Sequence, residues 1–385
     1  MFIVLALLTL GVLVFFHELG HFLMAKIFKV KVEEFGIGYP PRLGGFIFEK
    51  SKIKFFRRRK ERKSSSQTIY SLNLIPLGGF TKLKGEMGEE EGPDSFSVQA
   101  WWKKALVAAG GVLMNIFLAI LLFSFLSLIG IPRDLSQEDL GTAQVVSEPQ
   151  IQIGAVFSDS PAAQSGLEIG DVLLSVDDQN FSKLEEVQNY IQGKVGQSIE
   201  LEYQREEKIF QKNLPVLTYD QAFQEEESVS PAKPDKGFIG VFLSQTALVR
   251  YPWYRALGQG VSMTFSLLGQ IFSGIFLLLK SLVTEQKMIG GVVGPVGITQ
   301  MISDTARLGF IYLVHFAAVL SVAIGAFQLI PFPALDGSRI VFSLVEGVRR
   351  RRLSPRTEAM IMGLGFYLLL ILLIVISFRE IVNLF

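Results

Sequence analysis

The segment HELGH, residues 17–21, places two imidazoles and a carboxylate within five positions. On a helix, the H-E-x-x-H spacing puts both histidines on one face, where they can bind one metal ion, and puts the glutamate beside them as a general base. A chance match, or a pair of hydrogen-bonded histidines in a helical bundle, is the alternative interpretation. The context favours a metal site, because ionisable groups inside an apolar segment are costly unless they carry function.

The apolar stretch around HELGH is one of four segments that could cross a bilayer. Such a helix needs about 20 mostly apolar residues, and the segments are about 1–25, about 105–130, about 308–333 and about 359–378. The first lacks a basic start and a small-residue cleavage site, which favours a retained span over a removable signal peptide. A fifth stretch, 256–279, has no charge but is diluted by polar residues.

Two connecting segments, 50–63 and 339–356, are rich in Lys and Arg. The positive-inside rule places both in the cytoplasm, so the two termini and region 131–305 are expected outside. A span at 256–279 would put one basic segment outside. We therefore expect that stretch to lie along the outer interface or to pack on the helical bundle, with a fifth span as the alternative. The run FFRRRKERK also predicts contact with anionic lipid headgroups.

A catalytic zinc ion usually takes three protein ligands, and HELGH supplies two. The chain has no cysteine and only one further histidine, His315. His315 falls at the outer start of the third predicted span, whereas HELGH lies towards the cytoplasmic end of the first. Asp336, in IPFPALDGSRI, falls at the cytoplasmic end of the third span and can share the depth of His21. Prolines before Asp336 end the helix there, so a helix-end role is its alternative interpretation.

Region 151–215 changes in character, with short apolar runs separated by turn residues. Within it, FSKLEEVQNYIQ predicts a short amphipathic helix with Leu184, Val187 and Ile191 on one face. The stretch QSIELEYQREEKIFQKNL alternates as a β-hairpin does. We therefore expect a small α+β domain, followed by an acidic, proline-containing loop over 218–237.

Several motifs follow one another along nearly the whole chain. They are FFHELGHFLMAK, FGIGYPPRL, YSLNLIPLGGF, DSFSVQAWWKKALVAAGG, the α+β region, GPVGI and PFPALDG. In this series the chain resembles the site-two protease family of intramembrane zinc metalloproteases, and most closely its bacterial regulator-of-sigma-E protease branch.

The resemblance implies a membrane α-helical fold. Its core would be four transmembrane helices, with a cytoplasmic, membrane-associated β-hairpin and one inserted α+β PDZ-like domain. It implies Zn²⁺ held by His17, His21 and Asp336, with Glu18 as the catalytic acid and base. The implied setting is the bacterial inner membrane, with the active site towards the cytoplasm and the PDZ-like domain outside.

The implied activity is endopeptidase cleavage within membrane-spanning segments, as in regulated intramembrane proteolysis. The expected partners are the lipid bilayer and single-span substrates, either anti-sigma-factor-like proteins or signal-peptide remnants, often after an upstream first-site protease. The net charge of +1 does not suggest a nucleic-acid partner. A non-proteolytic membrane scaffold with a structural metal is the alternative function, and Glu18 argues against it because structural zinc needs no general base. A transporter would need more polar residues in the spans.

Two positions depart from the family pattern. Gln328 stands where the family's NxxPxPxLDG has an asparagine that is thought to contact substrate, and AGPxxN here lacks its proline but keeps Asn115. A helical substrate must be extended before cleavage, because its carbonyls are engaged in i to i−4 bonds. Adding it as a strand to an edge of FGIGYPPRLGGFIF or IYSLNLIPLGGFTKL would achieve this, unless that hairpin only lies on lipid. Candidate substrate contacts are Asn115, Gln328, Pro331, Gly36, Gly38, Leu74 and Gly79.

The expected domains are four ranges. Residues 1–130 form the first half of the membrane core, 145–250 the PDZ-like domain, 251–305 an interfacial or bundle-packed helical segment, and 306–385 the second half of the core. In the PDZ-like domain, a loop resembles the one that accepts a peptide C-terminus, although a glycine-rich start of a strand would explain its sequence equally well. The whole domain could instead act as a size filter above the active site. The loop residues are Phe238, Ile239, Gly240 and Val241.

Overall fold

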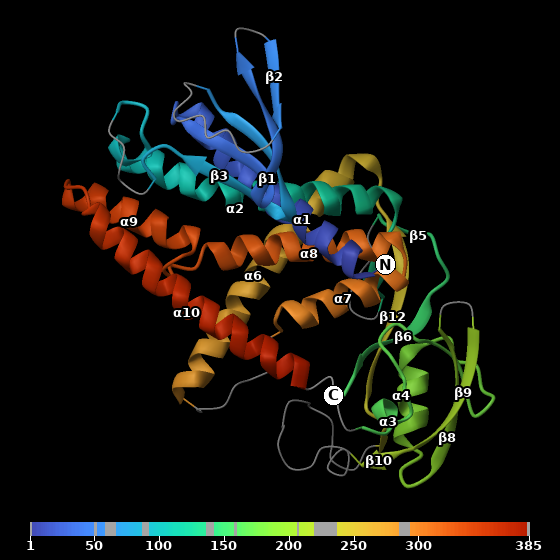
Figure 1. The fold of residues 1–385 in the computed structure, drawn as a ribbon. Coiled ribbons are helices and arrows are strands. Elements are labelled where there is room, and N and C mark those ends of the chain that lie inside the picture. The colour runs from blue at the N-terminus through green and yellow to red at the C-terminus, as the bar shows by residue number, and fades with distance from the viewer. Residues whose placement is uncertain are drawn as a thin grey trace. The chain divides into compact units, whose positions relative to one another are not determined.

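The fold was analysed in a computed structural model (Figure 1), which describes residues 2–49, 52–57, 67–86, 92–135, 142–157, 160–205, 208–218, 237–284 and 293–382. The chain divides into two compact units. The first consists of Met1–Ser124, Leu257–Thr305 and Leu313–Phe385, and the second of Phe125–Ala256 and Ala306–Tyr312. The basic run over 58–63 and the loop predicted over 219–236 lie outside the described residues.

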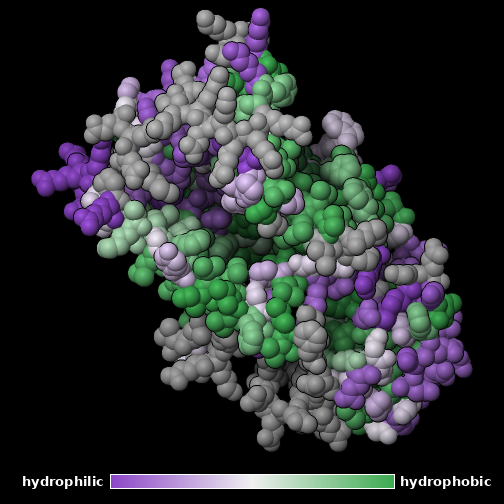
Figure 2. Space-filling view, in the orientation of Figure 1, coloured by the Kyte–Doolittle hydropathy of each residue, from purple (hydrophilic) through white to green (hydrophobic). Residues whose placement is uncertain are grey.

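Among the described residues, five helices are long and apolar enough to cross a membrane. They are α1 (Phe2–Ile27), α2 (Trp101–Ile129), α6 (Trp253–Thr284), α8 (Phe310–Gln328) and α10 (Pro355–Val382). Apolar side chains cover much of the helical surface of the first unit in Figure 2. A multi-pass membrane protein is therefore confirmed, but a core of four spans is not, because α6 also qualifies.

The two ends of α6 have different surroundings. A Cβ on Gly260 would lie 2.1 Å from Ser124 Oγ and 2.6 Å from the carbonyl oxygen of Ile120, so α6 packs closely on α2 at this point. Further along, Phe276 and Leu277 are 67% and 57% exposed. The start of α6 therefore packs on α2, while its later part presents an apolar surface suited to lipid. The expected interfacial or bundle-packed segment stays a prediction.

Two shorter helices, α7 (Pro295–Arg307) and α9 (Asp336–Arg349), were not predicted as separate elements, although most of α7 lies in the expected helical segment 251–305. Helix α7 begins against the end of α10, where the Glu380 carboxylate accepts hydrogen bonds from the backbone N–H groups of Gly294, Val296 and Gly297. A carboxylate is stabilised at a helix N-terminus by these unpaired donors and by the helix dipole. The GPVG motif therefore forms the start of a helix that α10 caps.

A three-stranded sheet follows α1, in the order β2-β1-β3. The strands are β1 (Val32–Glu49), β2 (Lys52–Arg57) and β3 (Ile69–Leu83). The sheet is bent, because Gly36 lies opposite both Phe80 and Ser71, and Ser71 also lies opposite Gly45. The part of β3 around Ser71 is therefore paired on both sides, with two different segments of β1. The part from Gly79 onward is paired with β1 on one side only. The arrangement is larger than the single hairpin that we expected.

The second unit has a sheet in the order β4-β12-β6-β7-β8-β9, with β5 also beside β12 and a separate β10-β11 pair. Helix α4 (Leu184–Gln192) buries Leu184, Val187 and Ile191, as its sequence predicted, and the predicted hairpin is also present. The strands and the remaining helix are β4 (Ile131–Asp134), β5 (Gln144–Val145), β6 (Gln150–Val156), α3 (Pro161–Gln164), β7 (Val172–Val176), β8 (Ser198–Arg205), β9 (Lys208–Pro215), β10 (Leu217–Thr218), β11 (Gly237–Phe238) and β12 (Val241–Arg250).

Strand β4 joins this sheet from before residue 145, the start that we expected for the domain. The apolar core of the unit lies between the sheet and α4, where Val187, Ile199 and Leu214 are fully buried. The second unit is thus an α+β fold with a core of its own.

Candidate metal centre

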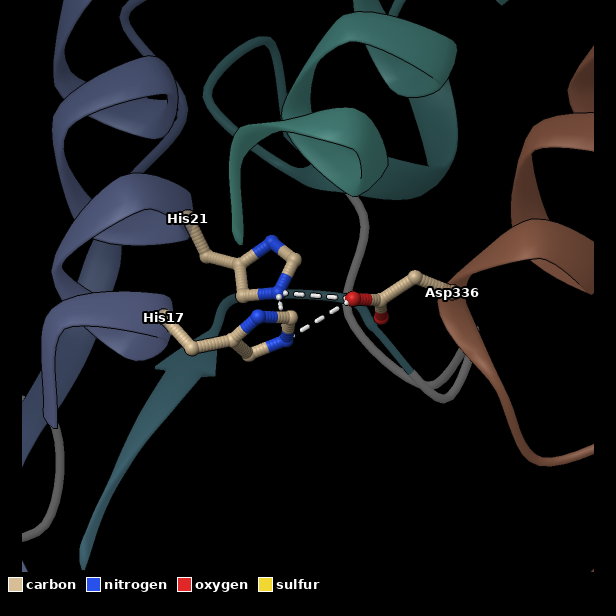
Figure 3. Close-up of side chains that lie close together, drawn as sticks. All are labelled: His17, His21 and Asp336. Carbon is tan, nitrogen blue, oxygen red and sulfur yellow. Dashed lines mark hydrogen bonds and ion pairs between the residues drawn. The ribbon is translucent and has the colours of Figure 1, made fainter. Parts of the chain in front are cut away.

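Three side chains from distant parts of the chain converge on one point (Figure 3). His17 and His21 come from α1, and Asp336 is the first residue of α9. Asp336 Oδ2 lies 3.0 Å from Nε2 of His17 and 3.1 Å from Nε2 of His21, and the two Nε2 atoms are 3.2 Å apart. His315 is not part of this cluster; its ring packs against Phe123 of α2, with 5.6 Å between centroids.

The arrangement fits a zinc ion. Two imidazole nitrogens and a carboxylate oxygen are ordinary zinc ligands, and at bond lengths of 2.0–2.1 Å the ligands of a tetrahedral ion lie about 3.3 Å apart. The three observed separations are close to that value. Helix α2 leaves room for the rings at Gly111, where a Cβ would lie 2.5 Å from His17 Cε1 and from His21 Nε2. Burial alone would raise the pKa of Asp336, but His21 and His17 outweigh it and hold that pKa below its usual range.

Each of the three candidate ligands has a second group beside it. Nδ1 of His21 is 2.9 Å from the carbonyl oxygen of Val107, and Nδ1 of His17 is 3.3 Å from Asn115 Nδ2. The backbone N–H of Asp336 donates to Gln328 Oε1 at 3.2 Å. Such partners orient metal ligands and select the tautomer of a histidine.

Glu18 follows His17 on α1 and is half-buried. Its carboxylate lies within electrostatic range of His21 and His17. Its backbone carbonyl accepts a hydrogen bond from Thr81 Oγ1 at 2.9 Å, and a Cβ on Gly79 would lie 3.9 Å from the Glu18 side chain. The edge of β3 therefore runs directly beside this carboxylate.

The remaining sequence candidates lie in two kinds of position. Asn115 and Gln328 contact the ligands themselves, whereas Leu74 is 56% exposed and Pro331 is exposed in the connection between α8 and α9. Gly38 has a φ of +78°, and a Cβ there would lie 2.6 Å from the carbonyl oxygen of Ile75. The turn of β1 thus requires a glycine at this position.

Sequence reasoning missed several groups around the site. One is the ring of Phe80, which a Cβ on Gly36 would meet at 2.4 Å. Another is Tyr39, whose pKa is raised by burial and by the nearby Glu18 carboxylate. Its place in the motif FGIGYPP was the signal that could have identified this hydroxyl. The backbone carbonyl of Val107 could not be predicted from the sequence as a partner of His21, because every residue type has a backbone carbonyl.

In the second unit, the predicted carboxylate-binding loop lies between β11 and β12. Gly240 has a φ of +89°, and its carbonyl oxygen accepts from the backbone N–H of Phe157. The carbonyl of Ile239 accepts from the N–H of Ala162. Val241 begins β12, and the ring of Phe238 packs against that of Phe157 with 5.6 Å between centroids. The carbonyls of the loop are therefore engaged with the unit itself.

Apolar helices that carry a His–His–Asp cluster with a glutamate beside it define a membrane metallopeptidase. The sequence profile of peptidase family M50 matches residues 5–372, and the chain belongs to this family. The family assignment agrees with the resemblance to site-two proteases that the motifs indicated.

Two relatives match the chain along almost all of its length, and both carry the name "Putative zinc metalloprotease". One, from Clostridium perfringens, is 30% identical over 99% of this chain and 99% of its own length. The other, from Mesorhizobium japonicum, is 31% identical over 94% of each chain. A PDZ domain of an SdrC-like protein from Listeria monocytogenes matches 26% of this chain and 92% of its own length, with 24% identity and a TM-score of 0.21. The predicted zinc dependence and peptide-bond hydrolysis are confirmed.

Proposed function

We propose that this peptidase cleaves its substrates within their membrane-spanning segments. The observation that carries the proposal is the position of His17, Glu18 and His21 inside α1, over Val4–Ile27, a helix apolar enough to span a bilayer. A soluble substrate would have no reason to meet a site at that depth. The substrates that fit are single-span membrane proteins, such as anti-sigma-factor-like proteins or signal-peptide remnants, and a first-site protease would trim some of them beforehand.

The proposed catalytic residue is Glu18. Zinc, when bound by His17, His21 and Asp336, supplies Lewis-acid catalysis and makes water acidic enough to be deprotonated near neutral pH. Glu18 then takes the proton of the attacking water and passes it to the leaving amine, as a general base and acid. The half-buried setting of its side chain keeps this proton transfer away from bulk solvent.

The substrate would be held as an added strand on the β3 edge from Gly79 onward. That edge pairs with β1 alone, and it runs beside Glu18. Main-chain hydrogen bonds to an edge strand hold a peptide extended, which exposes the carbonyl that a helix would hide. Ser71 lies inside the sheet, so it does not serve this role.

The second unit would act on the extracytoplasmic side as a PDZ-like domain. Among the described residues, neither the N–H of Ile239 nor that of Gly240 donates a hydrogen bond, which supports the capture of a peptide carboxylate there. We place the site towards the cytoplasm and both termini outside, on the basis of the basic segments 50–63 and 339–356.

The test is Glu18→Gln in the full chain, reconstituted in lipid. Glu18 is not among the proposed ligands, so the variant should bind zinc normally while cleavage of a single-span reporter falls by about 10²-fold or more, the usual contribution of a general base. The matched control is Glu185→Gln, on the exposed face of α4. Full reporter cleavage by the Glu18 variant would refute the proposed mechanism. Cleavage of a soluble peptide with no cleavage of the membrane reporter would refute the intramembrane substrate class.

A further inference from the structure

The carboxamide of Asn115 lies behind the imidazole of His17, next to the ring nitrogen that does not face Asp336. The Asn115 side chain is fully buried, and its Nδ2 is 3.3 Å from His17 Nδ1. The other end of the amide, Oδ1, is buried without a hydrogen-bond partner among the residues that the structure describes. Native proteins rarely leave a buried amide oxygen unpaired, so this atom calls for an explanation.

One face of α2 contacts both histidines at positions one turn apart. The carbonyl of Val107 meets Nδ1 of His21, Gly111 leaves room for both rings, and Asn115 meets Nδ1 of His17. Residues four apart share a helix face, so a single surface of α2 contacts both rings. Helix α8 fixes α2 at the same level, because Ser321 Oγ donates to the backbone carbonyl of Asn115 at 2.8 Å.

The two partners impose different conditions on their rings. A carbonyl can only accept, so Val107 keeps a proton on Nδ1 of His21 and leaves Nε2 with a lone pair for a metal. The amide of Asn115 can do either. In the orientation described, Nδ2 donates to Nδ1 of His17, which places the ring proton on Nε2, facing Asp336. A half-turn of the amide brings the unpaired Oδ1 to that position, where it accepts the Nδ1 proton and frees the Nε2 lone pair.

We propose that Asn115 is a positioning residue that fixes the ring orientation and proton placement of His17, and thereby raises the affinity of the protein for zinc. The proposal rests on the proposed function for the identity of the ligands. It replaces the substrate contact that the family resemblance suggested for Asn115. A side chain with no exposed surface that already touches a ligand is poorly placed to meet a substrate.

The experiment measures zinc affinity by competition with a chelator, using the full chain in lipid nanodiscs and no substrate. Asn115→Leu keeps the volume but removes the hydrogen bond, and it should weaken zinc binding by about 10- to 100-fold, the usual effect of losing such a partner. Asn115→Asp keeps an acceptor for the Nδ1 proton, so it should restore most of the affinity. Ser124→Ala removes another buried polar group of α2, away from the site, and should leave the affinity unchanged.

The absorption spectrum of the cobalt-substituted protein is a second readout, because it reports the ligand geometry directly. The Leu variant should shift this spectrum, and the Asp variant should bring it back. If the Leu variant does not fold, Asn115→Ser takes its place, since serine is too short to reach His17.

Two outcomes would overturn the proposal. One is native zinc affinity in the Leu variant with slower proteolysis, which would return Asn115 to a substrate contact. The other is an equal loss of zinc in folded Leu and Asp variants, which would show that the hydrogen bond is not the cause. Neither outcome depends on proteolysis by the Glu18 variant, so a failure of the proposed function stays distinguishable from a failure of this inference.

Discussion

Replacing Gly111 by alanine adds one methyl group beside the imidazole nitrogens that face Asp336. That methyl carbon would lie 2.5 Å from His17 Cε1 and from His21 Nε2, where 3.4 Å is the ordinary limit of contact. Each ring must therefore retreat by about 0.9 Å, and a displacement of about 1 Å at a catalytic site can cost about 10²-fold in rate. We expect zinc affinity and reporter cleavage to fall together, each by about that factor.

The same substitution should lower the free energy of unfolding by at most about 2 kcal/mol. Overpacking costs about 1–3 kcal/mol, and the better helix propensity of alanine offsets up to about 1 kcal/mol of it. The neighbouring Gly110 should behave in the opposite way. A Cβ there would lie 2.7 Å from the backbone carbonyl oxygen of Gly20, and backbone cannot rotate aside as a ring can. Gly110→Ala should therefore lower the unfolding temperature first and affect zinc only as a consequence.

The assay compares both variants with Gly269→Ala, whose added methyl would meet nothing within 4 Å. Chelator competition gives the zinc affinity, thermal unfolding gives the stability, and a single-span reporter gives the activity, all in the same lipid. If Gly111→Ala bound zinc and cleaved the reporter as the Gly269 variant does, the reasoning about the space that Gly111 leaves for the rings would be refuted.

Three further predictions concern the site and a buried ion pair elsewhere in the first unit. Asp336→Ala should abolish stoichiometric zinc binding while His315→Ala should retain it, as measured by metal analysis after dialysis; the reverse result would move the third ligand to α8. Gln328→Asn shortens the acceptor that caps Asp336 and should weaken zinc by about 10-fold in chelator competition, so an unchanged affinity would contradict the capping role. Lys104 and Glu346 form a 2.8 Å ion pair with 9% of each side chain exposed. Lys104→Met should cost about 3 kcal/mol of unfolding free energy, because it leaves the Glu346 charge uncompensated, and adding Glu346→Leu should recover part of that loss. An unchanged stability of the Lys104→Met variant would contradict this role of the ion pair.

The sequence was sufficient to predict the elements whose signals are local. HELGH on an apolar helix, and the amphipathic period of α4, both follow from spacing alone. The pairing of His21 with Asp336 was reached by a depth argument, since two spans of the same direction bring their cytoplasmic ends to one level. The structure brings these residues together, although the three-ligand role of the cluster stays a proposal.

What the sequence could not predict depends on contacts between distant segments. Helix α9 was not predicted because its arginine-rich end has the composition of a basic loop. Its apolar face can be recognised as such only when the segment that packs on it is known. The position of Ser71 inside the sheet depends on β1 bending back on itself, which strand propensity does not reveal. Hydropathy also cannot separate the packed start of α6 from its exposed end, because lipid and a protein interior are both apolar.

The candidate ligands of the metal centre come from helices far apart in the sequence, with His17 in α1 and Asp336 at the head of α9. During synthesis the first two donors enter the membrane long before the third has been made. A growing chain therefore cannot assemble the site until Asp336 has been made. A truncated product that ended after the second unit would carry Glu18 but lack Asp336.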